Sequence, residues 1–482
     1  MIDALYNISP VFLKRSYINA FKALQYLKYK SGIIRLPETE SRSLSFSTMK
    51  AYNRQRLYGF RPKLCYAPYS SMFFSRAGYM SPCYATYGKN SDKWPETSVR
   101  DAWFSGEFQN IREAMDEGNL NHACGFCQPQ FEQHNFGSLL PNKYEHYGIS
   151  KGKYPKIMEF ELSNRCNLQC VMCDGNLSSS IRKHRDKQPP LPEVYDNRFL
   201  EELREFIPHL QMAEFTGGDP FLIPIYYEIW EMIKKANPGC RILITTNGNT
   251  WSERIESMLN THKNLHFNIS IDSLRKDVYE TIRVGADFDD VMKNSKRFID
   301  YCHRHKTTCN ILVCPMSINL NDLPELVSFG NEQGCGVFFH TVVKPQKLSL
   351  KYQSADFLHQ AIEKLKTFTP PRSTDQEKQN AGNYHSMLSQ LESWHQQKRQ
   401  QENETPRNPE TAYAETMEAL DKRAREKVFR LVKALENDYR RASVLTLFRD
   451  SNAETIKQMV EAQDENRLLQ QARKQLNEEV NP

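Results

Sequence analysis

Three cysteines within eight residues, Cys166, Cys170 and Cys173, constrain this chain more than any other feature. They follow residues 157–162, where apolar and acidic side chains alternate as in a strand with one apolar face. Thiolates are the usual protein ligands of a cubane iron–sulfur cluster, and one short loop can supply three of them. The intervals differ from the CxxC pairs of zinc sites, and no fourth Cys or His follows nearby. The spacing predicts a 4Fe–4S cluster with one iron left open for chemistry. The alternative is three buried structural cysteines.

Strand-like and helical patterns alternate from residue 155 to about residue 345. The six strands are expected at 157–162, 212–216, 241–246, 265–271, 310–313 and 336–342. The fold class is therefore α/β, an open, partial (β/α)6 version of the TIM-like barrel. Ligands of such barrels lie at the C-terminal ends of the strands.

The cysteine spacing is the signature of the radical SAM superfamily, which this sequence resembles. Met172 stands where that family usually has an aromatic residue. The resemblance implies a catalytic 4Fe–4S cluster on the three cysteines, with S-adenosylmethionine (SAM) bound at the open iron.

Motifs at the expected strand ends resemble the SAM-binding positions of the same family. Gly217-Gly218-Asp219-Pro220 resembles the motif that holds the amino group of SAM, with Asp in place of the usual Glu. The resemblance places the ribose at Ser270 and Asp272, the carboxylate of SAM at Arg283, and the adenosine near Asn319. Adjacent glycines permit a close backbone approach to a ligand. Asp272 could instead cap the following helix.

Four more cysteines, Cys65, Cys83, Cys124 and Cys127, bracket an expected hairpin and helix. The hairpin strands are expected at 72–75 and 79–83, and the helix presents Trp103, Phe104, Phe108, Ile111 and Met115 on one face. The CxxC pair alone could be a redox pair or half of a zinc site, and all four could close one metal site.

This second cysteine pattern resembles the SPASM and twitch auxiliary-cluster modules of radical SAM enzymes. The resemblance covers Cys65, Pro68, Gly78, Cys83, Trp103, Phe108, Ile111, Arg112, Cys124 and Cys127. It implies a second, auxiliary 4Fe–4S cluster beside the catalytic one, although the module usually follows the catalytic domain and here precedes it. The alternative is a zinc knuckle.

A chain of 482 residues predicts two or three units. We expect an N-terminal helix and loop at 1–60, the auxiliary-cluster module at 61–150, the catalytic domain at 151–370, and a polar linker with C-terminal helices at 371–482. The small net charge of +6 does not indicate nucleic-acid binding. The absence of a long apolar run and the twelve cysteines favour a reducing cytoplasm over a membrane or secreted location.

The sequence patterns near both ends of the chain predict helices. Residues 9–31 form a basic amphipathic pattern that is expected to dock on its own protein rather than on a membrane. Residues 373–411 are polar and predict a flexible or loosely helical linker. Helices at 424–448 and 455–476 have narrow apolar stripes that suit a helical hairpin or a protein partner.

The other five cysteines are expected to be ordinary buried thiols, and Cys314 could line the pocket.

Together these patterns predict a radical SAM enzyme that reductively cleaves SAM to a 5′-deoxyadenosyl radical and abstracts hydrogen from a substrate. An auxiliary cluster favours an oxidative or cross-linking modification of a peptide, a protein or a small molecule. An external electron donor such as flavodoxin or ferredoxin is implied. The alternative function is an iron–sulfur electron-transfer protein or a zinc-stabilised binding protein without SAM chemistry.

Overall fold

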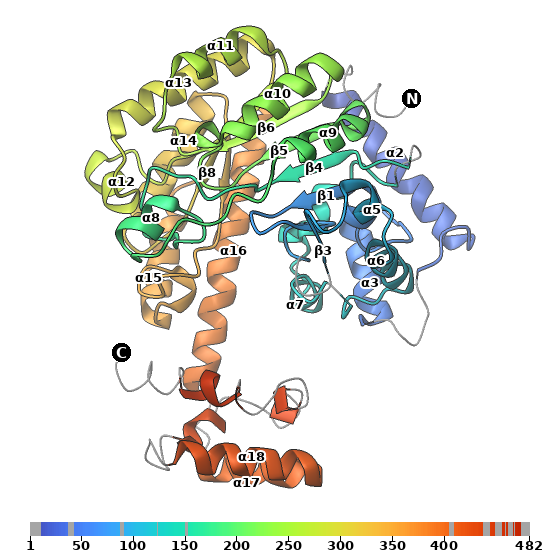
Figure 1. The fold of residues 1–482 in the computed structure, drawn as a ribbon. Coiled ribbons are helices and arrows are strands. Elements are labelled where there is room, and N and C mark those ends of the chain that lie inside the picture. The colour runs from blue at the N-terminus through green and yellow to red at the C-terminus, as the bar shows by residue number, and fades with distance from the viewer. Residues whose placement is uncertain are drawn as a thin grey trace. The chain divides into compact units, whose positions relative to one another are not determined.

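The computed structural model describes residues 11–36, 43–86, 91–122, 124–149, 153–403, 409–436 and 444–448, and also 456, 457, 459, 460, 466 and 468–473. The chain divides into two compact units, residues 1–392 and 393–482 (Figure 1). Among the described residues, no helix is both long and apolar enough to cross a membrane.

The first unit is built on one nine-stranded sheet with the strand order β3-β2-β1-β4-β5-β6-β7-β8-β9. Neighbouring strands from β4 to β9 are all parallel. These six are β4 (Ile157–Phe160), β5 (Met212–Phe215), β6 (Arg241–Thr246), β7 (Leu265–Ser270), β8 (Cys309–Val313) and β9 (Gly336–Phe339). The six predicted strands are confirmed, and the α/β fold is that of a partial barrel.

Helices connect the parallel strands and pack along the sheet (Figure 1). They are α8 (Ser179–His184), α9 (Asn197–Phe206), α10 (Pro224–Ala236), α11 (Glu253–Thr261), α12 (Lys276–Ile282), α13 (Phe288–His305) and α14 (Leu323–Glu332), followed by α15 (Ala355–Lys366). Helix α9 illustrates why they form. Asp196 accepts a hydrogen bond from the Phe199 backbone at its start, and the recurring apolar residues Phe199, Leu203 and Phe206 are buried.

The N-terminal strands belong to the same sheet, which the sequence did not predict. β1 (Ser71–Phe74) and β2 (Tyr79–Ser81) form the predicted hairpin, and β3 (Asp92–Lys93) follows. β1 also pairs in parallel with β4, with Ser71 opposite Ile157. The cysteine-rich module is therefore not a separate α+β unit, because its hairpin covers the edge that β4 would otherwise leave unpaired.

A helical layer surrounds this hairpin. It contains α2 (Val11–Lys30), α3 (Phe46–Gln55), α4 (Ala67–Ser70), α5 (Val99–Trp103), α6 (Gly106–Glu117), α7 (Gln128–Glu132), η1 (Phe136–Ser138) and η2 (Leu140–Tyr144). The single helix expected around residue 104 is two helices. Ser105 caps α6 by accepting from the Phe108 backbone, and Phe104 at the break is exposed rather than on the buried face.

Helix α2 docks on its own protein, as expected. Tyr29 stacks on Phe60 with ring centroids 4.2 Å apart, and Phe21 meets Tyr58 edge-on at 6.1 Å. The side chains of residues 11–17 lie outside the described set.

The stretch predicted to be a flexible or loosely helical linker is instead a long helix, α16 (Asp375–Asn403). Its first half belongs to the first unit, so the division falls after residue 392 and not at 370. Asn380 Oδ1 accepts from the Val337 backbone at 2.8 Å, and Asn383 Nδ2 donates to the Val337 carbonyl at 2.8 Å. Two asparagines thus satisfy the free edge of β9, and a polar sequence here serves a sheet edge rather than a solvated linker.

We expect Asn380→Ala to destabilise the first unit by about 1–3 kcal/mol, because it leaves the buried Val337 N–H and Cys335 C=O without partners. Urea unfolding followed by tryptophan fluorescence measures this. Gln379→Ala, at an exposed position of the same helix, is the matched control. Equal midpoints for the two variants would contradict the role of Asn380.

The second unit contains α17 (Pro409–Ala419), α18 (Lys422–Leu435) and η7 (Thr446–Phe448) around one apolar cluster. The predicted helix at 424–448 ends at Leu435, and residues 437–443 lie outside the described set. The helix predicted at 455–476 lies partly outside it, and its described residues Ile456, Val460 and Leu468 are buried in the cluster.

Candidate active site

The three-cysteine loop lies at the C-terminal end of β4 and is held by the start of α8. The Ser179 hydroxyl accepts from the Cys166 N–H at 3.0 Å and lies 3.1 Å from the Cys166 carbonyl, to which it can donate. Ser178 Oγ donates to the Leu168 carbonyl at 2.6 Å, and Asn164 Nδ2 donates to the Gly175 carbonyl at 2.9 Å. These contacts fix the loop backbone at both ends.

A second segment, residues 282–284, pairs with the same loop from the other side. The N–H groups of Gln169 and Val171 donate to the carbonyls of Val284 and Ile282 at 2.8 and 2.9 Å. This pairing brings Arg283 to the thiols, and its Nη1 lies 3.8 Å from Cys170 Sγ. The structure thereby brings Arg283 and the cysteines together, as predicted, across more than a hundred residues of chain.

Two hydrogen-bond donors face the sulfur atoms. Besides Arg283, Asn247 Nδ2 lies 3.8 Å from Cys166 Sγ. Asn247 follows β6, whose C-terminal end lies at the same edge of the sheet. The contact of this asparagine with the cysteine was not predicted from the sequence. Donors to thiolate sulfur stabilise the negative charge that a metal ligand carries.

The thiols of the loop differ in acidity. The hydrogen bond from Cys173, helped by Arg283, lowers the pKa of Cys170 to about 7 despite its burial. The same hydrogen bond raises the pKa of Cys173, and burial raises the pKa of Cys166 to about 11. Metal binding would release protons from these thiols, because the ligand is the thiolate.

Three cysteines on one loop, without a fourth Cys or His nearby in the sequence, have the chemistry that suits a cubane. Among the described residues, no three His, Cys, Asp or Glu side chains converge as ligands of one metal ion. A cubane binds each thiolate at a separate iron, so three cysteines around one loop can serve it without converging on one point.

The adjacent glycines permit close packing of the chain on itself. Gly217 has φ +100°, and a Cβ there would lie 2.5 Å from the Ser163 carbonyl oxygen. The Gly218 N–H donates to that carbonyl at 3.0 Å. The close approach expected for a ligand is therefore, in the structure, an approach of the β5 loop to the loop that leads to Cys166.

Asp219 is completely buried, and its carboxylate ties β5 to β6. Its Oδ2 accepts from Thr246 Oγ1 and the Asn247 N–H, both at 2.8 Å, and its Oδ1 accepts from the Phe221 N–H at 3.1 Å. Burial raises the pKa of Asp219, and these donors oppose the rise. Pro220 opens the short helix η4 (Pro220–Leu222) that Asp219 caps. Contact of Asp219 with the amino group of SAM stays a prediction.

The ends of β7 and β8 are joined by buried polar side chains. Asp272 Oδ2 accepts from Arg283 Nε at 2.8 Å, and its Oδ1 accepts from the Cys314 N–H at 2.7 Å. Asn319 Nδ2 donates to the carbonyls of Asp272 and Cys314 at 2.7 and 3.1 Å. Ser270, the last residue of β7, is half-buried. The glycine pair, Asp219, Ser270 and Asp272 lie at or just after strand ends at one edge of the sheet, whereas Arg283 follows helix α12 and Asn319 follows the loop after β8. The contacts of these residues with SAM stay predictions.

Three of the remaining cysteines lie together in the structure, which the sequence did not predict. Cys302, Cys309 and Cys335 are buried, and a side-chain hydrogen bond from Cys309 lowers the pKa of Cys302. Cys240 is buried as well, as expected for ordinary thiols. Cys314 is half-buried among Val171, Met172 and Met316 and thus packs beside the catalytic loop.

The second group of cysteines, Cys65, Cys83, Cys124 and Cys127, lines one cavity. Burial raises the pKa of each of the four thiols, to about 11 for Cys83 and about 12 for Cys124 and Cys127. The four side chains are therefore brought together, as predicted, from three separate segments.

This cavity lies at the opposite end of the strands from the catalytic loop. Cys83 packs with Ile157 and Met212, the first residues of β4 and β5. The strand from Ile157 to Leu162 spans about 16 Å at about 3.3 Å per residue, and Cys166 follows beyond it. The expectation that an auxiliary site lies beside the catalytic cluster is wrong, because β1 pairs with β4 and sets Cys65 and Cys83 at its N-terminal end.

The pattern residues around the four cysteines pack on one another. The Arg112 guanidinium lies 4.7 Å from the centroid of the Trp103 ring, and its Nε donates to the Pro68 carbonyl at 2.8 Å. Gly78 has φ +88°, and a Cβ there would lie 2.6 Å from the Trp94 carbonyl oxygen. The arginine thus joins the α5–α6 region to the segment that follows Cys65.

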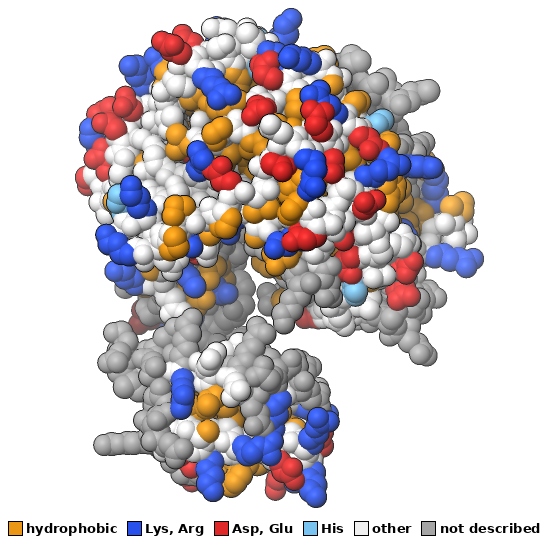
Figure 2. All heavy atoms as spheres, in the orientation of Figure 1, with side chains coloured by type: hydrophobic (Ala, Val, Ile, Leu, Met, Phe, Trp, Pro, Cys, Tyr) orange, Lys and Arg blue, Asp and Glu red, His pale blue; other side chains and the backbone are white. Residues whose placement is uncertain are grey.

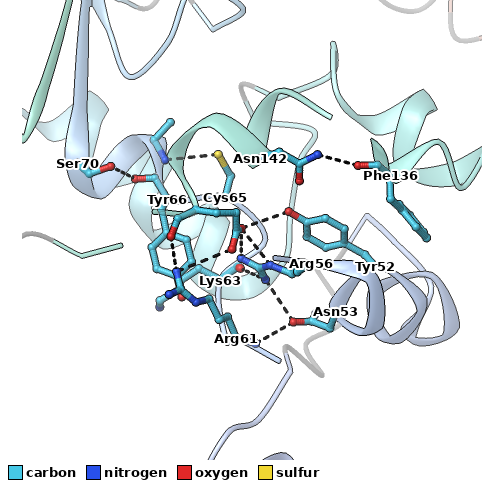
Figure 3. A network of polar contacts seen from close by, with 12 residues as sticks. Tyr52, Asn53, Arg56, Arg61, Lys63, Cys65, Tyr66, Ser70, Phe136 and Asn142 are labelled. Carbon is cyan, nitrogen blue, oxygen red and sulfur yellow. Dashed lines mark hydrogen bonds and ion pairs between the residues drawn. The ribbon is translucent and has the colours of Figure 1, made fainter. Parts of the chain in front are cut away.

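A half-buried and a fully buried charge network were not predicted from the sequence. Lys143 Nζ lies 2.7 Å from Glu159 Oε2 and 2.6 Å from Glu214 Oε2, on β4 and β5 between the two cysteine groups. The other network lies beneath Cys65 and centres on an ion pair of Arg56 with Glu145 (Figure 3). Arg56 Nη1 also donates to the Lys63 carbonyl at 2.7 Å, two residues before Cys65.

Comparison with known proteins agrees with this geometry. Residues 160–330 match the family model described as the radical SAM superfamily. This segment is a radical SAM superfamily domain. It contains the three-cysteine loop, the Gly-Gly-Asp-Pro segment, Arg283 and Asn319.

Similar proteins share only part of this chain. A probable GTP 3′,8-cyclase of Methanocaldococcus jannaschii is 26% identical over 185 residues, which are 38% of this chain and 57% of that protein. An AdoMet-dependent heme synthase of Methanosarcina barkeri is 26% identical over 140 residues, which are 28% of this chain and 36% of that protein. This chain therefore matches only about half, or less, of the length of these curated relatives.

Among solved structures, Streptococcus suis SuiB bound to S-adenosylmethionine is similar, with 16% identity and a TM-score of 0.35. The match covers 56% of this chain and 53% of SuiB.

Proposed function

We propose that this protein is a radical SAM enzyme whose catalytic 4Fe–4S cluster is held by Cys166, Cys170 and Cys173. The observation that carries the proposal is the placement of Arg283 Nη1 and Asn247 Nδ2 at 3.8 Å from Cys170 and Cys166 Sγ, at the C-terminal edge of a parallel sheet. When bound, such a cluster supplies the electron that cleaves SAM to methionine and a 5′-deoxyadenosyl radical, which removes a hydrogen atom from the substrate.

The chain's own residues would bind and orient SAM beside the loop. Arg283 is the candidate partner of its carboxylate, and Asp219 is the candidate partner of its amino group. The Asp219 N–H, which donates to the Arg165 carbonyl at 2.7 Å, and the two glycines hold the β5 loop against the cysteine loop. Ser270 and Asp272 are candidates for the ribose, and Asn319 positions the β7 and β8 ends near the adenosine. Asp272 already pairs with Arg283, so it also orients the guanidinium.

We further propose that Cys65, Cys83, Cys124 and Cys127 hold a second 4Fe–4S cluster and that the reaction is an oxidative or cross-linking modification. The substrate class is a peptide, a protein or a small molecule. The proposed reaction takes place in a reducing cytoplasm with an external one-electron donor. The relatives named above as a GTP cyclase and a heme synthase are consistent with a small-molecule substrate.

The test is incubation of the anaerobically reconstituted protein with SAM and dithionite. Methionine and 5′-deoxyadenosine in equal amounts support the proposal, and the absence of both from a preparation that contains iron and sulfide overturns it.

Substitution of Arg283 or Asp219 by alanine is expected to weaken SAM binding roughly ten- to a hundredfold, since each charge-assisted contact is worth about 1.5–3 kcal/mol. The absorbance of the cluster should not change, because neither residue is a ligand. Anaerobic calorimetric titration of SAM measures the affinity, and Arg275→Ala, which removes a half-exposed arginine paired with Asp322, is the control. Parental affinity in both variants would show that the SAM pocket lies elsewhere.

The second cluster can be examined in a variant that lacks the three catalytic cysteines. We expect X-ray absorption of that variant to show iron in sulfur coordination, because four thiols remain around one cavity. Zinc without iron would instead assign these cysteines to a zinc site. That outcome would leave the catalytic proposal intact.

A further inference from the structure

One exposed segment packs directly on the backbone that carries Cys173. It comprises the last turn of α8 and residues 185–188. Arg185 Nη2 donates to the Cys173 carbonyl at 2.7 Å. A Cβ at Gly175 would lie 3.0 Å from Arg182 Cα, so this glycine permits the contact. A single hydrogen bond therefore links the exposed Arg185 side chain to the backbone of Cys173, a predicted cluster ligand.

The segment is strongly basic. Arg182, Lys183, His184, Arg185 and Lys187 follow one another, and the one carboxylate among them, Asp186, lies 3.5 Å from Arg185. Lys183, Arg185 and Lys187 are exposed. Figure 2 shows Lys and Arg side chains over α8, whereas both signs are mixed over the rest of that face.

An exposed apolar side chain belongs to the same surface. Leu177, four residues after Cys173, keeps 41% of its surface exposed. Small apolar contacts surrounded by charged groups suit weak, transient protein encounters, which bury less area than stable complexes. We name Leu177 together with Arg182, Lys183, Arg185 and Lys187 the α8 surface.

We propose that the α8 surface is the docking site of an acidic one-electron carrier protein. This inference rests on the proposed function, which requires an electron from outside the chain. Complementary charge favours an acidic partner, and the Arg185–Cys173 contact makes this the surface from which the electron enters. In this step the carrier loses one electron and the cluster gains one, while no bond forms or breaks and no proton moves.

The test compares Lys183→Glu/Lys187→Glu with Lys293→Glu/Lys296→Glu, a matched pair of exposed lysines on α13. Arg185 is left in place because it contacts the loop. The probe is reduced flavodoxin, mixed at low salt with the full-length, anaerobically reconstituted protein. Stopped-flow absorbance of the cluster gives the second-order rate of reduction, and dithionite serves as the small-molecule reductant.

We expect the α8 variant to be reduced by flavodoxin about tenfold more slowly than the parent, because electrostatic steering is lost. The difference should shrink as salt is added. Reduction by the anion dithionite at high salt, where steering is screened, and both rates of the α13 variant should equal those of the parent.

Equal flavodoxin rates in the two variants overturn the docking site. A slower reduction by dithionite at high salt in the α8 variant also overturns it, since the substitutions would then act on the cluster itself. Normal reduction by flavodoxin combined with lost SAM cleavage would also overturn it, since the substitutions would then act on SAM binding and not on electron entry. Failure to assemble any cluster on the loop would instead refute the proposed function, and the docking site with it.

Discussion

Substitution of Cys166, Cys170 and Cys173 together by alanine is expected to remove one 4Fe–4S cluster per chain and to abolish SAM cleavage. The three thiols are the only protein ligands proposed for that cluster, and alanine supplies no replacement donor. Arg283 and Asn247, which face Cys170 and Cys166, would be left without the sulfur atoms they contact. SAM cleavage should be lost completely, because no other described residue is proposed to hold the cluster that donates the electron to SAM.

Iron and sulfide analysis with a 5′-deoxyadenosine assay, both under anaerobic conditions, measures this effect. Cys240→Ala is the matched control, because this thiol is also buried but lies at the opposite end of the strands, just before β6. It should keep the parental iron content and product yield. Continued 5′-deoxyadenosine formation by the triple variant would refute the assignment of the catalytic loop.

The elements that could be predicted are those whose signal is local. The parallel strands have short apolar or alternating patterns. The carboxyl ends of parallel strands meet at one edge, so motifs after β4, β5 and β7 were expected to converge. Arg283, Asp272 and Cys170 do meet there. The glycine pair was located correctly, but its partner is the Ser163 carbonyl, which no local pattern reveals.

What could not be predicted depends on contacts between distant segments. The pairing of β1 with β4 joins strands more than eighty residues apart, and it alone decides at which end of the sheet Cys65 and Cys83 lie. Helix α16 has a polar composition typical of a linker, yet Asn380 and Asn383 are polar because they bond to the edge of β9. A polar composition is expected of a solvent-exposed segment. Composition alone does not distinguish such a segment from one whose polar side chains make buried hydrogen bonds.

The ion pair beneath Cys65 is the clearest case of such a distant contact. Arg56 and Glu145 are eighty-nine residues apart, and their side chains are 0% and 1% exposed. Arg56 Nε donates to Glu145 Oε1 at 3.0 Å, and the Tyr52 hydroxyl donates to the same oxygen at 3.3 Å. Burial alone would lower the pKa of Arg56, but Tyr52 and Glu145 outweigh it and raise the pKa, so the guanidinium stays charged.

Arg56→Met is therefore expected to destabilise the first unit by about 3–5 kcal/mol, because the buried Glu145 carboxylate loses its main partner and keeps only the Tyr52 hydroxyl and Arg61, whose Nη1 lies 3.8 Å from Oε2. The double variant Arg56→Met/Glu145→Leu should be more stable than the single variant, since a well-packed apolar pair carries no uncompensated charge. Urea unfolding followed by tryptophan fluorescence compares the midpoints. Arg100→Met, which breaks the exposed pair of Arg100 with Glu205, should leave the midpoint unchanged.

The same substitution should also act on the four-cysteine site. Arg56 Nη1 holds the Lys63 carbonyl, so its loss frees the backbone that carries Cys65. Iron bound by the variant that lacks the catalytic cysteines should then fall when Arg56→Met is added, and should not fall with Arg100→Met. A single variant as stable as the parent, with a double variant that is less stable, would show that Glu145 is not held by Arg56. Because Cys65 is the one ligand that precedes β1, the network beneath it is what couples the stability of this unit to the proposed second cluster.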